Sequence, residues 1–155
     1  MSTHTAASFG AALRQLIDHL DAALEAAYRE DGLDFRPRYT PVVRAILADG
    51  PQSIRALSER LGVSHSAVSQ TVSQMAASRL VVVTRGEDDA RQRIVDLSRA
   101  GRAMLPRLDD HWRAARVATA VLDTETGGVL VEAVNRANAA LAATPFADRL
   151  RVARK

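Results

Sequence analysis

Serine and glutamine side chains recur along one side of the segment 64–78, at the spacing of a helix. The apolar residues Val68, Val72 and Met75 occupy the opposite side at i, i+4 and i+7, which predicts one buried face. Glutamine can form two hydrogen bonds with an adenine edge, and serine can bond a base or a phosphate. The polar side fits contact with base edges, or else is merely solvated; its residues are Ser66, Gln70, Ser73 and Gln74.

The start of this helix offers a second kind of contact. Ser64 is the expected N-cap, and the backbone N–H groups of a first helical turn favour a phosphate. Ser64, His65 and Ser69 are therefore candidates for phosphate contacts, although a cap alone also explains Ser64. Gln70, in the next turn, is our candidate for reading a base.

The positive charge that neutralises phosphates must come from outside this helix, because residues 64–78 contain no Lys or Arg. Arginines surround the segment instead, namely Arg55, Arg60, Arg79, Arg85, Arg91 and Arg93. Arg91 follows an expected turn and is the candidate for a minor groove, whose negative potential attracts arginine. The alternative is that Arg91 only pairs with Asp88 or Asp89 and braces a hairpin.

A second short helix precedes the polar one. Ser53 is its expected cap, and its buried side is Ile54, Leu57 and Leu61. Gly62 supplies the turn to Ser64, and we expect Val63 to fill the gap beneath that turn. Two capped helices joined at a glycine predict a helix-turn-helix, whose second helix enters the major groove of DNA.

The flanking segments complete a mainly α fold with a small β-wing. A β-branched run at 80–84, a turn at 86–89 and an alternating segment at 91–97 predict a β-hairpin. Further helices are expected at 5–31, 41–48 and 99–122, with a last one from Asp123 or Thr124 to 143. The tail 146–155 is either a short helix or frayed.

Composition excludes several classes of protein. The 155 residues include no cysteine, which removes disulfides, thiol nucleophiles and cysteine-bound zinc. No apolar run approaches the ~20 residues of a membrane span, and the start lacks the pattern of a signal peptide, so we expect a cytoplasmic, nucleoid-associated protein. The net charge of +3 suits a nucleic-acid partner. No catalytic motif, cofactor motif or strong metal motif is present, and we expect no enzyme activity.

The chain resembles the MarR family of winged helix-turn-helix transcription regulators. The resemblance rests on LSERLGVSHSAVSQTVSQM (57–75) and RLVVVTRGEDDARQRIVDLSRAGR (79–102). The wing signature of the family is D-x-R and then L-[ST]-x-x-G, which here is Asp89-Ala90-Arg91 and 97–101. One departure is that Gly86 and Asp88 replace the first pair of a commonly doubled D-x-R. The resemblance implies a dimeric repressor, less often an activator, that binds a palindromic site and is commonly released by small aromatic or phenolic acids.

The terminal helices carry apolar stripes wider than a winged domain of about 60 residues can cover. We therefore expect a homodimer in which the first, fifth and sixth helices interlock. Residues 1–35 and 103–155 would form the helical dimerisation region, and residues 36–102 the winged helix-turn-helix that binds double-stranded DNA.

An effector site would lie between the dimerisation helices and the winged domain. Aromatic rings together with arginines suit an aromatic carboxylate, because guanidinium pairs with carboxylate in a fork. The candidates are Tyr28, Phe35, Arg36, Arg38, Tyr39, Trp112 and Arg116. Core packing is the competing explanation for Tyr28 and Trp112. A less favoured hypothesis is a metal site formed by His19 and His111, each of which has two aspartates beside it in the sequence. Exposed, solvated helix faces explain these histidines and aspartates more simply.

Two other functions compete with a specific regulator. A winged helix can bind protein through the same helix, but the polar outer face flanked by arginines favours DNA. A non-specific architectural protein would be expected to carry a lysine-rich face, which this helix lacks. Comparing a specific with a random duplex would separate the architectural reading from the regulator.

Overall fold

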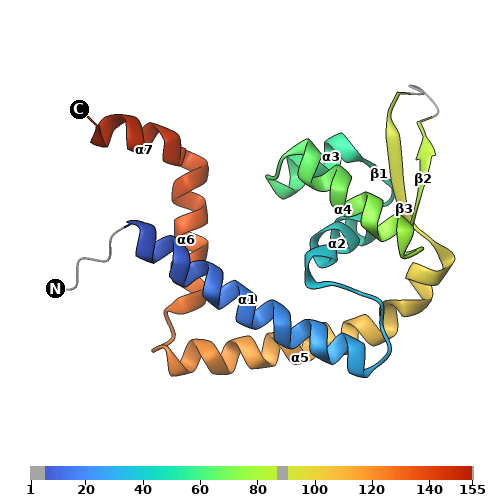
Figure 1. Cartoon of the computed structure of the whole chain (residues 1–155), viewed down its shortest axis with the longest axis horizontal. Helices are drawn as coiled ribbons and strands as arrows, with labels where there is room; N and C mark the ends of the chain where they lie inside the picture. The colour runs from blue at the N-terminus through green and yellow to red at the C-terminus, as the bar shows by residue number, and fades with distance from the viewer. Residues whose placement is uncertain (1–5, 87–90, 155) are drawn as a thin grey trace. The chain divides into compact units, whose positions relative to one another are not determined.

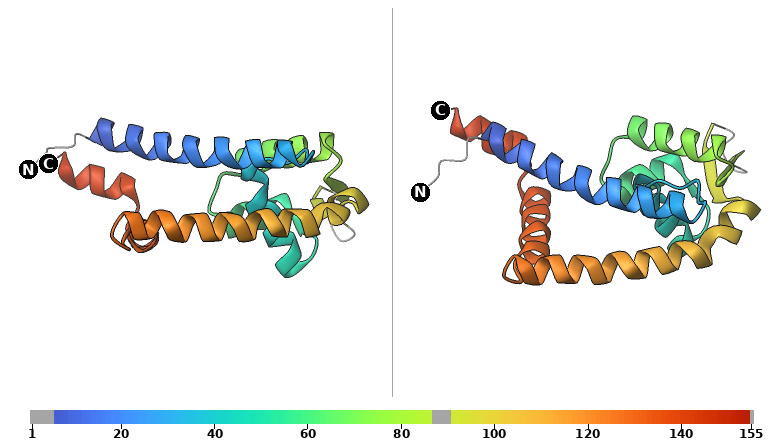
Figure 2. Two further views of the ribbon diagram at one scale, coloured as in Figure 1. Left: turned by 90° about the horizontal axis from the view of Figure 1, so that it is seen from below. Right: turned by 60° about the horizontal axis from the view of Figure 1, so that its bottom comes forward.

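The structure is a computed structural model that describes residues 6–86 and 91–154. The chain divides into two compact units, Met1–His111 and Trp112–Lys155. The first contains the long helix α1 (Ala6–Glu30), a 3-10 turn η1 (Pro37–Tyr39), and the short helices α2 (Thr40–Asp49), α3 (Ile54–Leu61) and α4 (His65–Ala77) (Figure 1). Helix α1 is a single uninterrupted helix (Figure 2). Within one or two residues, these are the helices that the sequence predicts.

The wing is a three-stranded antiparallel sheet of order β1–β3–β2. Strands β2 (Val81–Arg85) and β3 (Arg93–Leu97) form the predicted hairpin, although β3 begins two residues later than expected. Strand β1 (Gln52–Ser53) pairs with Ile94 and Val95 and was not predicted. A strand of two residues shows no alternation that a sequence pattern could reveal. Its effect is to fasten the start of α3 to the wing.

The helix-turn-helix packs as its spacing predicts. Ile54 and Leu57 of α3 and Val68, Val72 and Met75 of α4 are all buried. Both caps form: Ser53 Oγ accepts from Ala56 N at 3.1 Å, and Ser64 Oγ accepts from Ala67 N at 3.2 Å. Gly62 adopts a φ of +64°, a left-handed conformation that glycine allows without strain.

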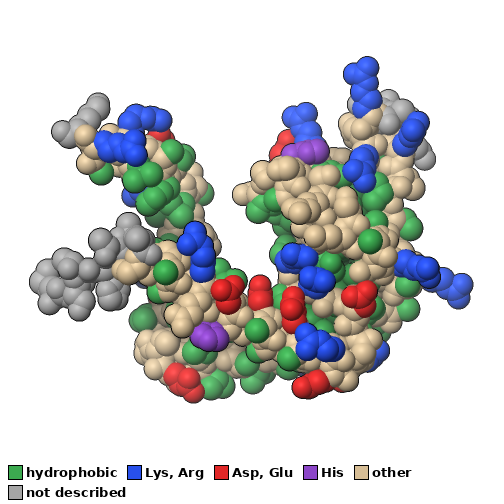
Figure 3. All heavy atoms as spheres, viewed as in Figure 1, with side chains coloured by type: hydrophobic (Ala, Val, Ile, Leu, Met, Phe, Trp, Pro, Cys, Tyr) green, Lys and Arg blue, Asp and Glu red, His purple; other side chains and the backbone are tan. Residues whose placement is uncertain are grey.

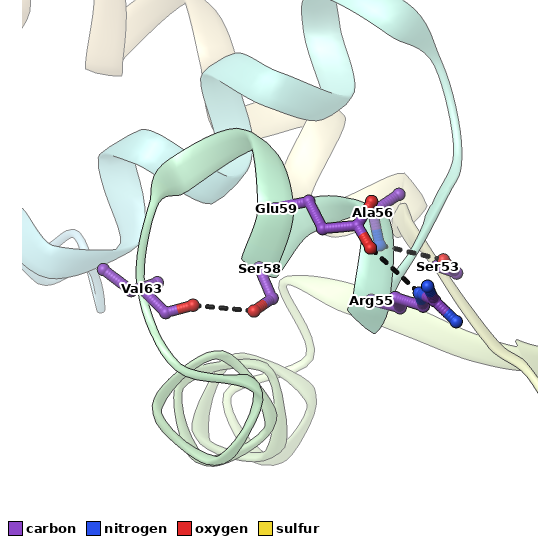
Figure 4. A network of polar contacts seen from close by, with 6 residues as sticks. All are labelled: Ser53, Arg55, Ala56, Ser58, Glu59 and Val63. Atoms are coloured by element: carbon purple, nitrogen blue, oxygen red, sulfur yellow. Dashed lines mark hydrogen bonds and ion pairs between the residues drawn. The ribbon is translucent and has the colours of Figure 1, made fainter. Parts of the chain in front are cut away.

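Val63 corrects one expectation, because its side chain is 46% exposed and does not fill the turn. The turn is held instead by its backbone, since the Ser58 hydroxyl donates to Val63 O at 2.6 Å (Figure 4). The exposed apolar side chain lines a shallow apolar groove between α2, α3 and α4.

An aromatic cluster joins α1 to the winged domain. Phe35 lies edge-on to Tyr28 at 5.3 Å and to Tyr39 at 5.7 Å between ring centroids, and all three rings are buried. Edge-to-face pairs at such distances add about 0.5–1.5 kcal/mol beyond burial. These contacts fix the end of α1 against η1 and the start of α2.

Helix α5 (Arg99–Glu125) starts in the first unit and continues into the second. In the second unit follow α6 (Leu130–Ala143) and α7 (Phe146–Ala153), so the tail forms the short helix that was one of two expectations. The expected start of the sixth helix at Asp123 or Thr124 is wrong, because α5 extends further and Gly127 and Gly128 make a turn with positive φ. Asp123 still caps α6: its Oδ1 accepts from Val131 N at 2.9 Å.

Apolar side chains remain uncovered on helices of both units. On α1 they are Phe9, Leu13, Ile17 and Leu20, and on α6 and α7 they include Val134, Leu141, Phe146 and Leu150. Across the described residues, no helix is both long and apolar enough to cross a membrane.

Candidate nucleic-acid interface

Helix α4 presents the predicted polar side to solvent. Ser66, Gln70 and Ser73 are exposed, and Gln74 and Ser69 are half-buried. The opposite side is fixed in the core by Val68 and Val72, at 2% and 0% exposure. Because the buried side fixes the rotation of the helix, Gln70 projects outward into solvent, and an exposed amide of this kind is able to form two hydrogen bonds with an adenine edge. The Ser73 hydroxyl already donates to Ser69 O at 2.8 Å, which leaves it as an acceptor only.

The first turn of α4 is polar and exposed. Ser64 Oγ caps the helix and also lies 3.1 Å from Ser66 Oγ. His65, the first residue of the helix, is exposed next to it. The hydroxyls and N–H groups of this turn therefore favour a phosphate at this end of the helix.

Arg55 of α3 lies near that turn. Arg55 is exposed and pairs with Glu59 at 2.9 Å (Figure 4). This hydrogen bond, together with the charge of Glu59, raises the pKa of the Arg55 guanidinium above its ordinary value. Arg60 pairs with Asp49 and faces a different part of the unit.

The wing adds three exposed arginines. Arg85 and Arg93 are directly opposite partners at the outer end of the β2–β3 ladder, and Arg91 comes two residues before β3. Figure 3 shows Lys and Arg side chains gathered at the end of this unit that carries α3 and the hairpin. Asp88 and Asp89, the proposed partners of Arg91, lie outside the described residues.

The structure brings some of these side chains together and leaves others apart. Arg55, His65, Arg91 and Arg93 line one hollow of about 190 Å³ between α3, α4 and the wing. Ser53 and Gln92 also line it, and the sequence interpretation missed both, because Ser53 showed only the pattern of a cap. Arg79 has a φ of +58° and follows the far end of α4, which places it about 20 Å along the helix from His65.

The structure places the effector candidates in different surroundings within the two units. Tyr28, Phe35 and Tyr39 are buried in the aromatic cluster, and Trp112 and Arg116 belong to the second unit. Arg36 lines a hollow of about 430 Å³ at the end of α1, together with Arg29, Glu25, Asp34 and neighbouring backbone. Arg38 is exposed near Tyr39, with its guanidinium carbon 5.7 Å from the centre of the ring.

The histidines do not meet in a metal site within the described residues. His111 Nε2 lies 2.8 Å from Asp31 Oδ2, and its ring lies edge-on to Tyr28. Arg107 donates to Asp31 O close by. His111 thus helps to fix α5 to the end of α1.

The fold and the exposed polar helix define a winged helix-turn-helix protein with long flanking helices. A model described as the MarR family matches residues 32–92 of the chain. This part of the chain, which contains the helix-turn-helix, is therefore similar to the MarR family, in agreement with the resemblance seen in the sequence. No curated protein matches the chain.

Solved structures of transcription regulators share the fold over most of the chain. The PcaV regulator from Streptomyces coelicolor in complex with its natural ligand has 18% identity and a TM-score of 0.67, covering 89% of this chain and 94% of that one. A probable regulator from Pseudomonas aeruginosa has 22% identity and a TM-score of 0.62, covering 81% and 96%. Reduced AbfR bound to DNA has 16% identity and a TM-score of 0.61, covering 83% and 93%.

Proposed function

We propose that this chain is a sequence-specific, DNA-binding transcription regulator that represses its target genes. The observation that carries the proposal is the exposed polar side of α4, which is held outward by Val68 and Val72 and bordered by arginines of α3 and the wing. A helix of this kind supplies base contacts, while the arginines supply contacts to phosphates. The DNA-bound structure of AbfR, which shares the fold, supports the same use here.

The regulator acts as a homodimer on a palindromic operator. Support comes from the uncovered apolar residues of α1, α6 and α7, since monomeric soluble proteins rarely leave large apolar patches exposed. A dimer with a two-fold axis would place two α4 helices on half-sites about one helical turn of DNA apart, which makes the operator palindromic.

Release by a small aromatic or phenolic acid is the regulatory part of the proposal. The hollow at the end of α1 offers Arg29 and Arg36 for a carboxylate beside Phe35, in a volume of about 430 Å³. PcaV, which shares the fold, was solved in complex with its natural ligand, and this supports the proposal of a small-molecule effector. Benzoate and 4-hydroxybenzoate are suitable first probes, with thermal stabilisation of the free protein and release of DNA as the two readouts.

The deciding experiment is fluorescence-anisotropy binding of the full chain to the DNA upstream of its own gene and to a scrambled duplex, at two salt concentrations. A preference of ~10³-fold or more for the native duplex supports a specific regulator. Equal binding to both that weakens steeply with salt would favour an operator elsewhere or an architectural role. Absence of binding to either duplex would favour a protein-interaction module over a DNA-binding regulator.

A further inference from the structure

The hollow of about 430 Å³ at the end of α1 is lined by charged side chains of both signs. Glu25 and Arg29 come from α1, and Asp34 and Arg36 come from the connector that leads to η1. Its volume lies within the ~300–1,000 Å³ that small-molecule sites usually have. The aromatic acid proposed above uses only the two arginines, so the two carboxylates of the hollow remain to be explained.

The connector turns its two charged side chains to one side. Burial alternates along it, because Leu33 and Phe35 are buried and Asp34 and Arg36 are exposed. Residues two apart in an extended segment point to the same side. The packing of Leu33 and Phe35 in the core therefore directs the carboxylate of Asp34 and the guanidinium of Arg36 outward together, above an apolar floor.

The charges of the hollow do not neutralise one another by direct contact. Glu25 and Arg29 have the i, i+4 spacing at which opposite charges can pair on a helix. Within residues 6–86 and 91–154, however, none of the four charged residues of the hollow takes part in an ion pair. Partial burial, followed by the charge of Glu25, raises the pKa of the neighbouring Asp21 carboxyl. The negative charge of Glu25 thus acts on its surroundings and is available to a cation.

The end of α1 adds a second attraction for a cation. The carbonyl end of a helix carries partial negative charge, which favours a positive group nearby. Gly32, whose N–H donates to Arg29 O at 3.0 Å, closes the helix and itself lines the hollow. An ammonium group is therefore favoured at the same place where guanidinium groups favour a carboxylate.

A ligand with a single charge would leave half of this lining unsatisfied. A plain carboxylate on Arg29 and Arg36 would be repelled by the two acids, and a plain amine would be repelled by the two arginines. We propose that the effector is an amino acid with an aromatic side chain, whose carboxylate binds Arg29 and Arg36 and whose ammonium group binds Glu25 and Asp34. The inference rests on the proposed effector site and adds a second charged group to the aromatic acid.

The floor of the hollow connects it to the DNA-facing helix. Phe35 lines the hollow and lies edge-on to Tyr39 at 5.7 Å between ring centroids. Tyr39 belongs to η1, which contacts both α1 and α4. A side chain seated against Phe35 thus bears on the element that supports α4, so we expect the amino acid to release DNA.

The test compares three probes that differ in one charged group. Calorimetry on the full-length chain at pH 7.5 measures the affinity for L-phenylalanine, for 3-phenylpropionate, which lacks the amine, and for 2-phenylethylamine, which lacks the carboxylate. We expect L-phenylalanine to bind at least about tenfold more tightly than either truncated probe, since each loses charge-assisted hydrogen bonds. A saturating concentration of it should also release the preferred duplex in the anisotropy assay.

Neutral variants assign each charge of the ligand to its partner. Glu25→Gln and Asp34→Asn should weaken L-phenylalanine about tenfold and bind 3-phenylpropionate no more weakly than the wild type does, because the change removes a repulsion. Arg36→Gln should weaken both of these probes. Glu30→Gln removes an exposed acid of α1 that does not line the hollow, and should behave as the wild type. Circular dichroism melting checks that each variant folds.

The outcomes separate this inference from the proposed function. If 3-phenylpropionate binds as tightly as L-phenylalanine, the amino acid is wrong and a plain aromatic acid remains the effector. If L-phenylalanine binds Glu25→Gln and Asp34→Asn as it binds the wild type, the hollow is not its site. Binding without release of the duplex would overturn its role as effector. If none of the three probes nor 4-hydroxybenzoate binds, both this inference and the proposed effector are wrong, while specific DNA binding is judged by the duplex comparison alone.

Discussion

Gly101 packs directly on the backbone of Leu80, so closely that a Cβ at position 101 would lie 2.2 Å from Leu80 O. Ser98 fixes this approach from both sides. Its N–H donates to Leu80 O at 3.0 Å, and its hydroxyl accepts from Gly101 N at 2.9 Å. The start of α5 is thereby joined to the turn between α4 and β2, which is the turn that positions α4 against the wing.

Gly101→Ala should destabilise the protein by about 1–3 kcal/mol, because the clash is with backbone that cannot turn away. The helix propensity of alanine, about 1 kcal/mol in its favour, offsets only part of that cost. Urea unfolding followed by circular dichroism measures the difference. Gly10→Ala in α1 makes the same change where nothing lies within 4 Å, and should be neutral or stabilising. Equal effects of the two substitutions would contradict the close approach.

The sequence predicts most of the winged domain because its signals are local. A cap serine followed by apolar residues at helical spacing needs no tertiary context, and Ser53, Ser64, Val68 and Val72 behave as their pattern indicates. The departures occur where tertiary contacts decide the outcome. Strand β1 exists only because β3 lies beside it. The sequence predicts that the Val63 side chain fills the gap beneath the turn, yet the backbone of Val63, and not its side chain, holds the turn.

The candidate nucleic-acid interface was likewise predictable from the sequence only where the signal is local. Helical spacing was enough to place Gln70 on the exposed side of α4. Spacing could not show that His65 and Arg93, 28 positions apart, line one hollow, because that depends on how the hairpin returns to α3. It also could not show that Tyr28 and Tyr39 are occupied in packing against Phe35 instead of lining an open pocket.

Gln70→Ala should weaken binding to the preferred duplex by about 1–3 kcal/mol and relax selection at one base position. The side chain is exposed and removed from the core, so the fold should be unaffected. Anisotropy with the preferred duplex and with its single-base variants measures the loss. Gln15→Ala, an exposed glutamine on α1, is the control. A uniform loss over all duplexes would assign Gln70 to the backbone and not to a base.

Arg91→Ala should weaken binding whatever the sequence under α4 and flatten the salt dependence, because each phosphate contact contributes about 0.9 to the slope. An arginine in the minor groove predicts one thing more. Replacement of A·T pairs by G·C pairs under the wing widens the groove and should weaken the wild type but not the variant. Arg116→Ala, on α5 in the second unit, is the matched control. An unchanged slope of log K against log salt would show that Arg91 does not contact DNA.

Ile17→Lys should convert the protein to a monomer. Ile17 is 55% exposed in the single chain, so a lysine there costs little in the monomer, but its charge would be buried in a helical interface. Light scattering should report a mass near twice 16.7 kDa for the wild type and near 16.7 kDa for the variant. Gln15→Lys adds the same charge on another side of α1 and should remain dimeric. A monomeric wild type at micromolar concentration would contradict the homodimer.

Asp21 on α1 should make stability depend on pH. Partial burial, followed by the charges of Glu25 and Asp18, raises the pKa of the Asp21 carboxyl above its ordinary value. The folded state therefore holds this proton more tightly than the unfolded state, for which the pKa is near 3.9. The free energy of unfolding consequently falls as the pH rises from about 4 through the raised pKa. Asp21→Asn removes this loss, so the variant should melt above the wild type at pH 7 and together with it at pH 3. An equal difference in melting temperature at both pH values would show that the substitution acts through packing and not through the charge.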